Sequence, residues 1–138
     1  MKAQANLRPE DYDALGAFRY AMRKFLRFSK EALAAAKLTT EQYEALLAVK
    51  TRSNSEGITV GELSERLQVK HHTTVTLLDK LVARRLVVRR RASEDRRRVH
   101  IKLTSRGGSV LARMAALHRR EIRHRSSEMI EALKRLEK

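Results

Sequence analysis

The stretch of residues 59–104 changes its apolar period partway along, and this change constrains the fold more than composition does. Before Leu86, apolar residues recur at spacings of three and four, which is typical of amphipathic helices. Between Val99 and Leu103, apolar and polar residues alternate, as in a strand with one buried face. We therefore expect two short helices followed by a β-hairpin, with residues 86–88 in the partner strand.

The tip of the expected hairpin, residues 89–98, contains six arginines and no apolar residue larger than alanine. Two short helices followed by a basic hairpin is the order of a winged helix-turn-helix, whose second helix enters a DNA major groove. Thr59 and Glu62 have the spacing of a capping box, so the first helix should begin at Val60. The second helix is expected at residues 71–84.

Polar and basic side chains on the second helix and on the hairpin are the candidate DNA-binding residues. Their types suit hydrogen bonds with phosphates and base edges, and contacts with thymine methyl groups. For each threonine taken alone, solvent exposure without a role is the alternative. The set comprises Lys70, His71, His72, Thr73 and Thr76 on the helix, with Arg89, Arg91, Arg96, Arg97 and Arg98 on the hairpin.

The sequence gives little support to catalysis or metal binding. His71 and His72 are adjacent and so project about 100° apart on a helix, which favours contacts with DNA over chelation of one metal ion. Asp95 is expected to orient a neighbouring arginine. The sequence has no cysteine, and it contains no Gly-rich phosphate loop, nucleophile motif or metal-ligand cluster. We therefore expect no enzymatic activity, no cofactor and no metal site.

The charge of the chain also favours a polyanionic partner. With 31 Lys and Arg against 16 Asp and Glu, the formal net charge of the 138 residues is +15, which is self-repulsive without an anionic partner. Nucleic acid is favoured over a membrane, because the basic residues are densest beside the helix-turn-helix pattern and no apolar run has spanning length. The amino terminus does not resemble a signal peptide, so we expect a cytoplasmic protein.

Long amphipathic helices are expected on both sides of this pattern. The first should start at Pro9 and carry an apolar stripe, and all three Phe residues lie in this helix. Such a stripe needs a second surface to cover it, and a partner subunit is one candidate. The expected architecture is a single domain of residues 1–138, mainly α-helical with a small antiparallel β-wing. Its winged helix-turn-helix core, at about residues 38–104, lies between long terminal dimerisation helices at about 9–36 and 105–138.

Two segments resemble the MarR family of bacterial transcriptional regulators. The LTTEQ segment at residues 38–42 follows a long basic amphipathic helix, as in that family. The second segment, residues 67–107, contains the most specific motif, an Asp-x-Arg core leading into an alternating strand. In this chain the motif consists of Asp95, Arg96, Arg97, Val99, Ile101, Leu103, Thr104 and Gly107. The resemblance covers nearly the whole chain.

The resemblance implies a homodimer of winged-helix lobes that are joined by their terminal helices and bind pseudo-palindromic operators. It implies that Arg97 enters a minor groove, and that a small aromatic or phenolic effector releases a repressor from DNA. Alternatives remain open: a member without an effector, or a basic winged-helix module that binds structured RNA or binds DNA architecturally.

The chain departs from the family pattern at the end and at the start of the second helix. Where the family usually has a glycine after the helix, this chain has Arg85, for which a left-handed backbone costs more than for glycine. The helix is therefore expected to end in another way. At its start, Lys70, His71 and His72 replace the family's Ser/Thr-rich segment, so a half-site preference cannot be carried over.

Arg19 and Arg23 are the candidate effector-binding residues. They lie one turn apart on the first helix, beside an apolar stripe that includes Phe18, Met22 and Leu26. A guanidinium group next to apolar walls suits the carboxylate of an aromatic acid. The alternative is that both arginines are solvated or touch a partner subunit.

Overall fold

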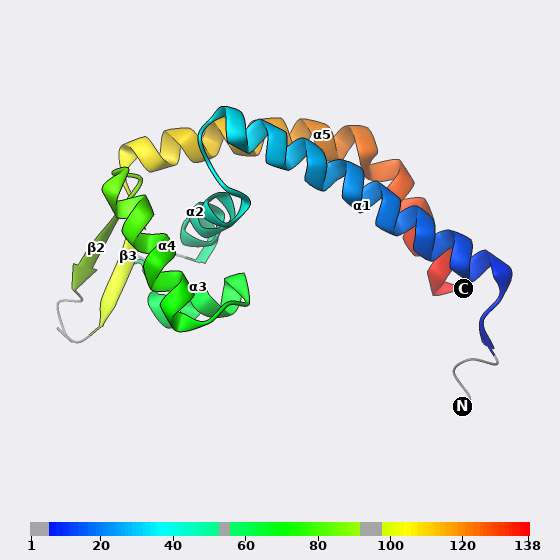
Figure 1. The fold of residues 1–138 in the computed structure, drawn as a ribbon, viewed down its shortest axis with the longest axis horizontal. Helices are drawn as coiled ribbons and strands as arrows, with labels where there is room; N and C mark the ends of the chain where they lie inside the picture. The colour runs from blue at the N-terminus through cyan, green and yellow to red at the C-terminus, as the bar shows by residue number, and fades with distance from the viewer. Residues whose placement is uncertain (1–5, 53–55, 92–97) are drawn as a thin grey trace. The chain divides into compact units, whose positions relative to one another are not determined.

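The structure is a computed structural model, and it describes residues 6–52, 56–91 and 98–138. In chain order its elements are α1 (Pro9–Ala35), α2 (Thr40–Arg52), β1 (Ile58–Thr59), α3 (Val60–Leu67), α4 (His71–Ala83), β2 (Val87–Arg91), β3 (Val99–Leu103) and α5 (Ser105–Glu137) (Figure 1). This confirms the expected mainly helical fold with a small antiparallel sheet. The chain divides into two compact units: a central unit, Leu33–Ala115, and a terminal unit, which combines α1 up to Ala32 with α5 from Ala116 onwards.

The terminal unit is built from two antiparallel helices that lie side by side (Figure 1). Between them, Ser29 Oγ and His118 Nε2 form a buried hydrogen bond of 2.7 Å. The rings of Phe25 and Phe28 each meet the His118 ring edge-on, with centroids 6.0 Å apart. The pairing of a buried hydroxyl with a buried imidazole satisfies both groups, which is the condition under which polar atoms are tolerated inside a protein.

The starts of the helices follow from local sequence signals. α1 begins at Pro9, and the Asp11 carboxylate accepts a hydrogen bond of 2.9 Å from the backbone N–H of Arg8. This backbone hydrogen bond lowers the pKa of Asp11. Thr39 and Gln42 form a reciprocal pair of 3.1 Å hydrogen bonds at the start of α2. α3 begins with the expected capping box at residues 59–62, which confirms the sequence-based prediction for this helix.

The three strands of the central unit form an antiparallel sheet in the order β1-β3-β2. Ile58 pairs with Ile101, and where β2 ends and β3 begins Arg91 pairs with Val99. The sheet and helices α2 to α4 enclose one apolar core. Its most deeply buried members, each at most 1% exposed, are Leu46, Val49, Ile58, Leu63, Leu78, Leu81, Leu86, Val87 and Ile101.

α4 ends with Arg85 in the left-handed region, at a φ of 61°, so the expectation of another kind of ending was wrong. The Arg85 N–H donates to the carbonyl of Val82 at 2.9 Å, and the Leu86 N–H donates to that of Leu81 at 3.0 Å. These two bonds define a Schellman motif, which satisfies carbonyls that the helix end would otherwise leave unpaired. The turn also places Leu86 in the core at 1% exposure, and both gains offset the cost of the left-handed backbone.

α5 is continuous from Ser105 to Glu137, so the apolar residues after Ser126 extend this helix and do not form a separate one. Thr104 directly precedes it, and Oγ1 of Thr104 accepts a hydrogen bond of 2.9 Å from the backbone N–H of Gly107. Thr104 Oγ1 also donates to the carbonyl of Arg85 at 2.6 Å. The start of α5 is thus tied to the turn after α4.

Candidate nucleic-acid interface

α4 is held against α3 by a polar contact, and its inner face is apolar. Thr74 is fully buried, and its Oγ1 accepts a hydrogen bond of 2.8 Å from Ser64 Oγ of α3. Leu78 and Leu81, also fully buried, continue the inner face of the helix. The buried position of Thr74 shows that it serves packing and is not available to a ligand. Because this face is fixed, the opposite face of α4 is presented to solvent in a defined orientation.

The candidate residues of α4 are all exposed and occupy its first turns. Lys70 is the N-cap residue, and its ammonium group forms no ion pair or hydrogen bond with any residue that the structure describes. Thr76 Oγ1 donates to the carbonyl of His72 at 3.0 Å, which leaves the hydroxyl oxygen able to accept further bonds. The exposed set is Lys70, His71, His72, Thr73 and Thr76.

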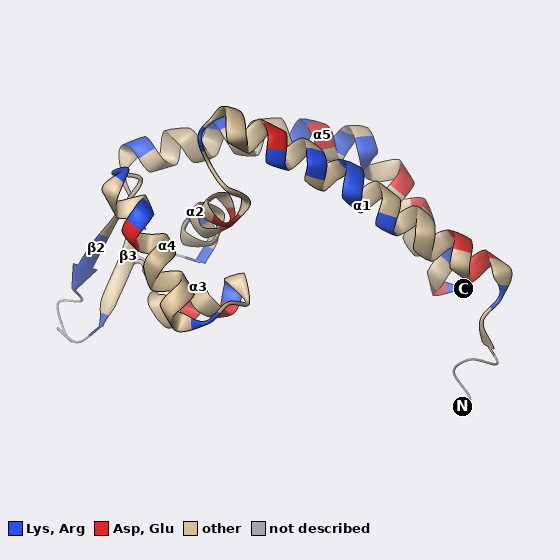
Figure 2. Ribbon diagram, in the orientation of Figure 1, with Lys and Arg blue, Asp and Glu red and all other residues tan. Residues whose placement is uncertain are grey.

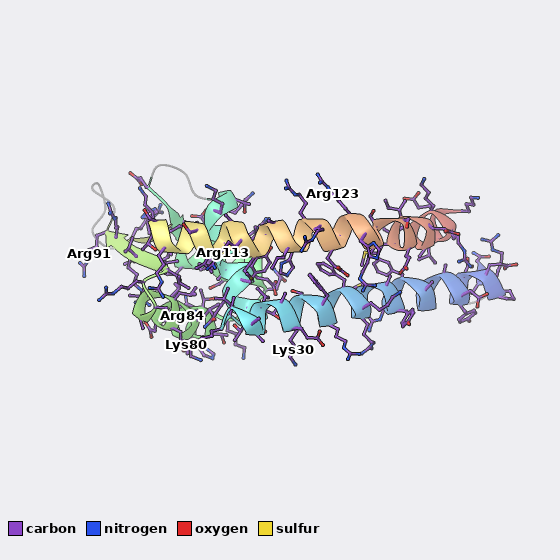
Figure 3. All side chains as sticks on the ribbon, turned by 90° about the horizontal axis from the view of Figure 1, so that it is seen from above. Lys30, Lys80, Arg84, Arg91, Arg113 and Arg123 are labelled. Carbon is purple, nitrogen blue, oxygen red and sulfur yellow. The ribbon has the colours of Figure 1, made fainter. Side chains whose placement is uncertain are left out.

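The wing adds a concentration of positive charge to the same unit. The outer part of β2 consists of Arg89, Arg90 and Arg91, all exposed (Figure 2). Arg91 points outward from the end of the strand (Figure 3). Arg98, next to the start of β3, is also exposed. The candidates Asp95, Arg96 and Arg97 lie outside the described residues.

Asp79 helps to organise the candidate interface, and the sequence analysis did not predict this role. Its Oδ1 lies 2.5 Å from a guanidinium nitrogen of Arg89, and this ion pair connects α4 to β2. Asp79 is the sole acidic residue of α4, ten positions before an arginine cluster. That isolation was the available signal, but spacing alone does not show which arginine it reaches. The pair fixes the orientation of the wing arginine relative to the exposed helix.

Arg84 is a second missed residue, and it acts at the other end of α4. Its guanidinium group donates to the carbonyl of Lys37 and to Oε1 of Gln42, at 2.5 and 3.4 Å. These bonds connect the end of α4 to the start of α2. The sequence carried no signal for them, because the partners lie more than 40 positions away.

Two of the candidate residues meet where α3, α4 and β3 begin. His71 and Arg98 line a hollow together with Thr59, Val60 and Val99. One guanidinium, one imidazole and one hydroxyl around a surface hollow form a set that suits a phosphate group. The sequence placed His71 and Arg98 in separate elements, and the fold brings them together.

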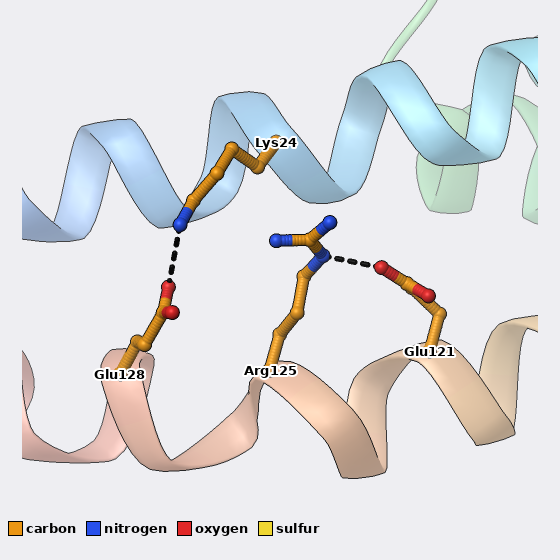
Figure 4. Close-up of polar contacts among 4 residues, drawn as sticks. All are labelled: Lys24, Glu121, Arg125 and Glu128. Carbon is orange, nitrogen blue, oxygen red and sulfur yellow. Dashed lines mark hydrogen bonds and ion pairs between the residues drawn. The ribbon is translucent and has the colours of Figure 1, made fainter.

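Arg19 and Arg23 belong to the terminal unit. Both are exposed, and they line a hollow on α1 with Met22, Leu26, Arg27 and Lys30. Other cations of this unit are neutralised: Lys24 pairs with Glu128 at 2.9 Å, and Arg125 pairs with Glu121 (Figure 4). Arg19 and Arg23 make no ion pair with any residue that the structure describes. The fold therefore places both beside Met22 and Leu26 of the apolar stripe, as expected, although Phe18 does not line the hollow.

The described ranges contain neither a metal-binding cluster nor a membrane-spanning helix. Across residues 6–52, 56–91 and 98–138, no three His, Cys, Asp or Glu side chains gather in a group that could hold a metal ion. Across the same ranges, each helix is either too short or too polar to cross a membrane.

A sequence model described as MarR family matches residues 36–98, which include α2, α3, α4 and β2. Among curated protein sequences, none matches the chain. Solved structures with a similar fold include a mutant of Staphylococcus aureus MepR, with a TM-score of 0.74, 22% identity and 80% of each chain covered. A MarR family protein from Bacillus stearothermophilus has a TM-score of 0.68 and 26% identity, over 75% of this chain and 70% of that one.

A third similar structure is a mutant of Escherichia coli MarR complexed with operator DNA. Its TM-score is 0.68 at 24% identity, with 86% of each chain covered. The sequence match lies on the helix-turn-helix and the first wing strand, and the fold match extends over most of the chain. The chain is therefore similar to the MarR family, in sequence over residues 36–98 and in fold over most of its length.

Proposed function

We propose that this protein is a transcriptional regulator that binds duplex DNA as a homodimer, with α4 in the major groove. The observation that carries the proposal is the exposed polar face of α4 beside a basic wing, with the ion pair of Asp79 and Arg89 connecting them. The size of α4 is suitable, because an α-helix fits into the major groove of B-DNA. The E. coli MarR mutant that was solved with operator DNA has the same fold.

In this proposal the two parts of the interface have different tasks. The wing arginines neutralise phosphates, which gives affinity but carries no sequence information. His72, Thr73 and Thr76 contact base edges from α4, because hydroxyl and imidazole groups match the donors and acceptors of the groove. His71 and Arg98 hold one backbone phosphate in the hollow that they share, and so fix the register of the helix on the duplex.

Exposed apolar side chains of the terminal unit support the homodimer. Leu15 and Leu26 of α1 are 45% and 51% exposed, and Ile122, Ile130 and Leu133 of α5 are between 45% and 49% exposed. Apolar patches of this kind mark surfaces that bind another protein. A second copy of this chain would cover them and would place two α4 helices on the two halves of an operator.

The regulator is proposed to be a repressor that a small aromatic acid releases. The hollow on α1 supports this, because it combines the guanidinium groups of Arg19 and Arg23 with the apolar side chains of Met22 and Leu26. An effector has to favour the DNA-incompetent arrangement by about 1–3 kcal/mol to act as a switch. Benzoates and hydroxybenzoates should raise the thermal unfolding temperature of the wild type. Arg19→Ala and Arg23→Ala should lose this response, whereas Arg135→Ala should keep it.

The DNA assignment is tested by selecting bound sequences from a random duplex pool, followed by a comparison with duplex RNA of the same sequence at equal salt. Bulk electrostatics attract both polymers, so only groove readout separates them. We expect a two-fold symmetric motif whose half-sites are about one helical turn apart, and weaker binding of the RNA. Equal affinity for RNA, with no enriched motif, would identify a sequence-independent nucleic-acid binder instead.

A further inference from the structure

A pocket beside α4 has a net negative charge, whereas the protein as a whole has a net positive charge. It lies in the central unit and has a volume of about 350 Å³. This volume is at the lower end of the range for small-molecule sites, roughly 300–1,000 Å³. Its walls come from the first turns of α2, the end of α3, the turn before α4 and one face of α4. The lining residues are Thr39, Glu41, Gln42, Glu44, Leu67, Val69, His72, Thr73, Thr76, Leu77 and Lys80.

The pocket has an apolar wall that suits the body of a small ligand. Leu67, Val69 and Leu77 are half-buried and all line it. Thr39 and Gln42, at another edge, are occupied by their mutual hydrogen bonds. A ring or short alkyl chain placed against the three apolar side chains would remove more of their surface from water, which is favourable in proportion to the area covered.

Two carboxylates of the pocket lack a cationic partner. Glu41 and Glu44 lie one turn apart on α2, and neither forms an ion pair or hydrogen bond with any residue in the described part of the chain. Burial and the neighbouring charge of Glu41 raise the pKa of Glu44, so the two groups destabilise each other's charge. In a protein of net charge +15, two adjacent acidic groups without a cation are unexpected. A bound cation would relieve this repulsion.

The other charges of the pocket determine how many positive charges a ligand should carry. Lys80 also lines it and forms no ion pair with a described residue. The formal charges of Glu41, Glu44 and Lys80 leave an excess of one negative charge. The charge balance therefore fits a monocation, and the apolar wall fits an organic body rather than a metal ion.

We propose that this pocket binds a small organic monocation, with its ammonium group at Glu41 and Glu44 and its apolar body against Leu67, Val69 and Leu77. The ligand competes with DNA, because His72, Thr73 and Thr76 line the pocket and also belong to the DNA-reading face of α4. This second statement rests on the proposed function. The site differs from the hollow at Arg19 and Arg23 in its unit, its charge and its ligand class, and release from DNA here needs no change in helix spacing.

Three probes with one ring and a two-carbon side arm isolate the role of charge. They are 2-phenylethylammonium, neutral 2-phenylethanol and the anion phenylacetate, each titrated calorimetrically into the full chain without DNA. An exposed ion pair contributes up to about 1 kcal/mol, so each carboxylate that the cation meets should make it bind up to about fivefold more tightly than the alcohol. The anion should bind most weakly. Equal binding of cation and alcohol, tighter binding of the anion, or no binding of the cation at millimolar concentration would overturn the site.

Matched variants locate the binding. Glu41→Gln with Glu44→Gln should lower the affinity for the cation to that for the alcohol. Glu131→Gln with Glu137→Gln, on exposed positions of α5, changes the net charge by the same amount and should leave binding unchanged. Loss of binding in both double variants would show a nonspecific effect of charge and would contradict the site. Circular dichroism checks that each variant keeps its helical content.

Competition is measured separately, by adding 2-phenylethylammonium to the complex with a selected duplex. We expect the apparent DNA affinity to fall as the pocket fills, and to stay constant in the Glu41→Gln, Glu44→Gln variant. If the cation binds the free protein but leaves DNA affinity unchanged, the competition is wrong and the site stands. If the protein binds no duplex, the proposed function fails, while calorimetry still decides whether the pocket binds the cation.

Discussion

A Cβ atom at Gly107 would lie 1.9 Å from the carbonyl oxygen of Leu86. That carbonyl cannot easily retreat, because it also accepts a hydrogen bond of 3.1 Å from the Thr104 N–H. Gly107→Ala should therefore lower the free energy of unfolding by about 1–3 kcal/mol, as forced overpacking does. Urea denaturation measures this change.

Gly108 provides the control for this prediction. An added Cβ at Gly108 has no neighbouring atom within 4 Å. Gly108→Ala should raise the free energy of unfolding by about 1 kcal/mol, since alanine favours a helix over glycine. If both alanine variants changed stability in the same direction, the close approach of α5 to Leu86 would be incorrect.

Arg85 gives a prediction of the opposite kind, because its backbone adopts a conformation that suits glycine better. The backbone φ of Arg85 is 61°. Its side chain is exposed and forms no hydrogen bond with a described residue, so the substitution removes no such contact. Arg85→Gly should raise the free energy of unfolding by about 1 kcal/mol by removing the left-handed penalty. Ala83→Gly, two residues earlier and still helical, should lower it by a similar amount. A destabilised Arg85→Gly variant would argue against the Schellman ending.

The same residue shows where reasoning from the sequence stops. Capping at Thr39 and Thr59 was predictable because both partners lie within four positions of each other. The left-handed backbone of Arg85 was not predictable. Lys37 and Gln68 also have a left-handed backbone, with φ values of 60° and 56°. In each case two backbone hydrogen bonds, together with the burial or packing of the next residue, override the preference of one residue. Single-residue preferences do not contain that information.

At the scale of elements, the pair of Ser29 and His118 carries the most specific contact between α1 and α5. Ser29→Ala removes the hydroxyl from a buried Nε2 atom, which should lower stability by about 1–3 kcal/mol. Thermal unfolding followed by circular dichroism measures the loss. Ser127→Ala, exposed on α5, should leave stability unchanged or slightly raised. Equal effects of the two substitutions would mean that the buried bond contributes nothing.

The elements themselves were largely predictable, whereas their mutual contacts were not. Strong periods of 3.6 and 2 indicated the helices and the two strands of the hairpin. The sequence does not decide whether α5 continues past Ser126, because two adjacent serines neither stop nor require a helix. The ion pair of Asp79 with Arg89 and the bonds of Arg84 depend on how elements pack, which periodicity does not encode.

We expect assembly of the whole molecule to depend on exposed apolar side chains near the end of α5. Ile130 and Leu133 are 49% and 45% exposed on α5, and the proposed homodimer buries them. Ile130→Glu with Leu133→Glu should therefore yield monomers in sedimentation experiments and weaken operator binding. Arg135→Glu changes the charge by the same amount on the opposite face of the helix and should leave a dimer. An intact dimer of the double variant would place the interface elsewhere.

In the proposed interface the wing supplies affinity and α4 supplies specificity, and the two contributions can be measured separately. Removing phosphate contacts flattens the dependence of log affinity on log salt by about 0.9 per contact. Removing a base contact instead reduces discrimination between sequences by about 1–3 kcal/mol. Variants of the wing should therefore change the salt dependence of binding, whereas variants of α4 should change the preference between DNA sequences.

The decisive measurement is the affinity of the wild type and two double variants for a selected and a scrambled duplex, over a series of salt concentrations. Arg91→Ala with Arg98→Ala should weaken binding to both duplexes and flatten the slope by up to about 1.8. Thr73→Ala with Thr76→Ala should keep the slope and reduce the preference for the selected duplex. A wild-type affinity that does not depend on salt, or two variants with the same loss of slope and of preference, would contradict this division of the interface.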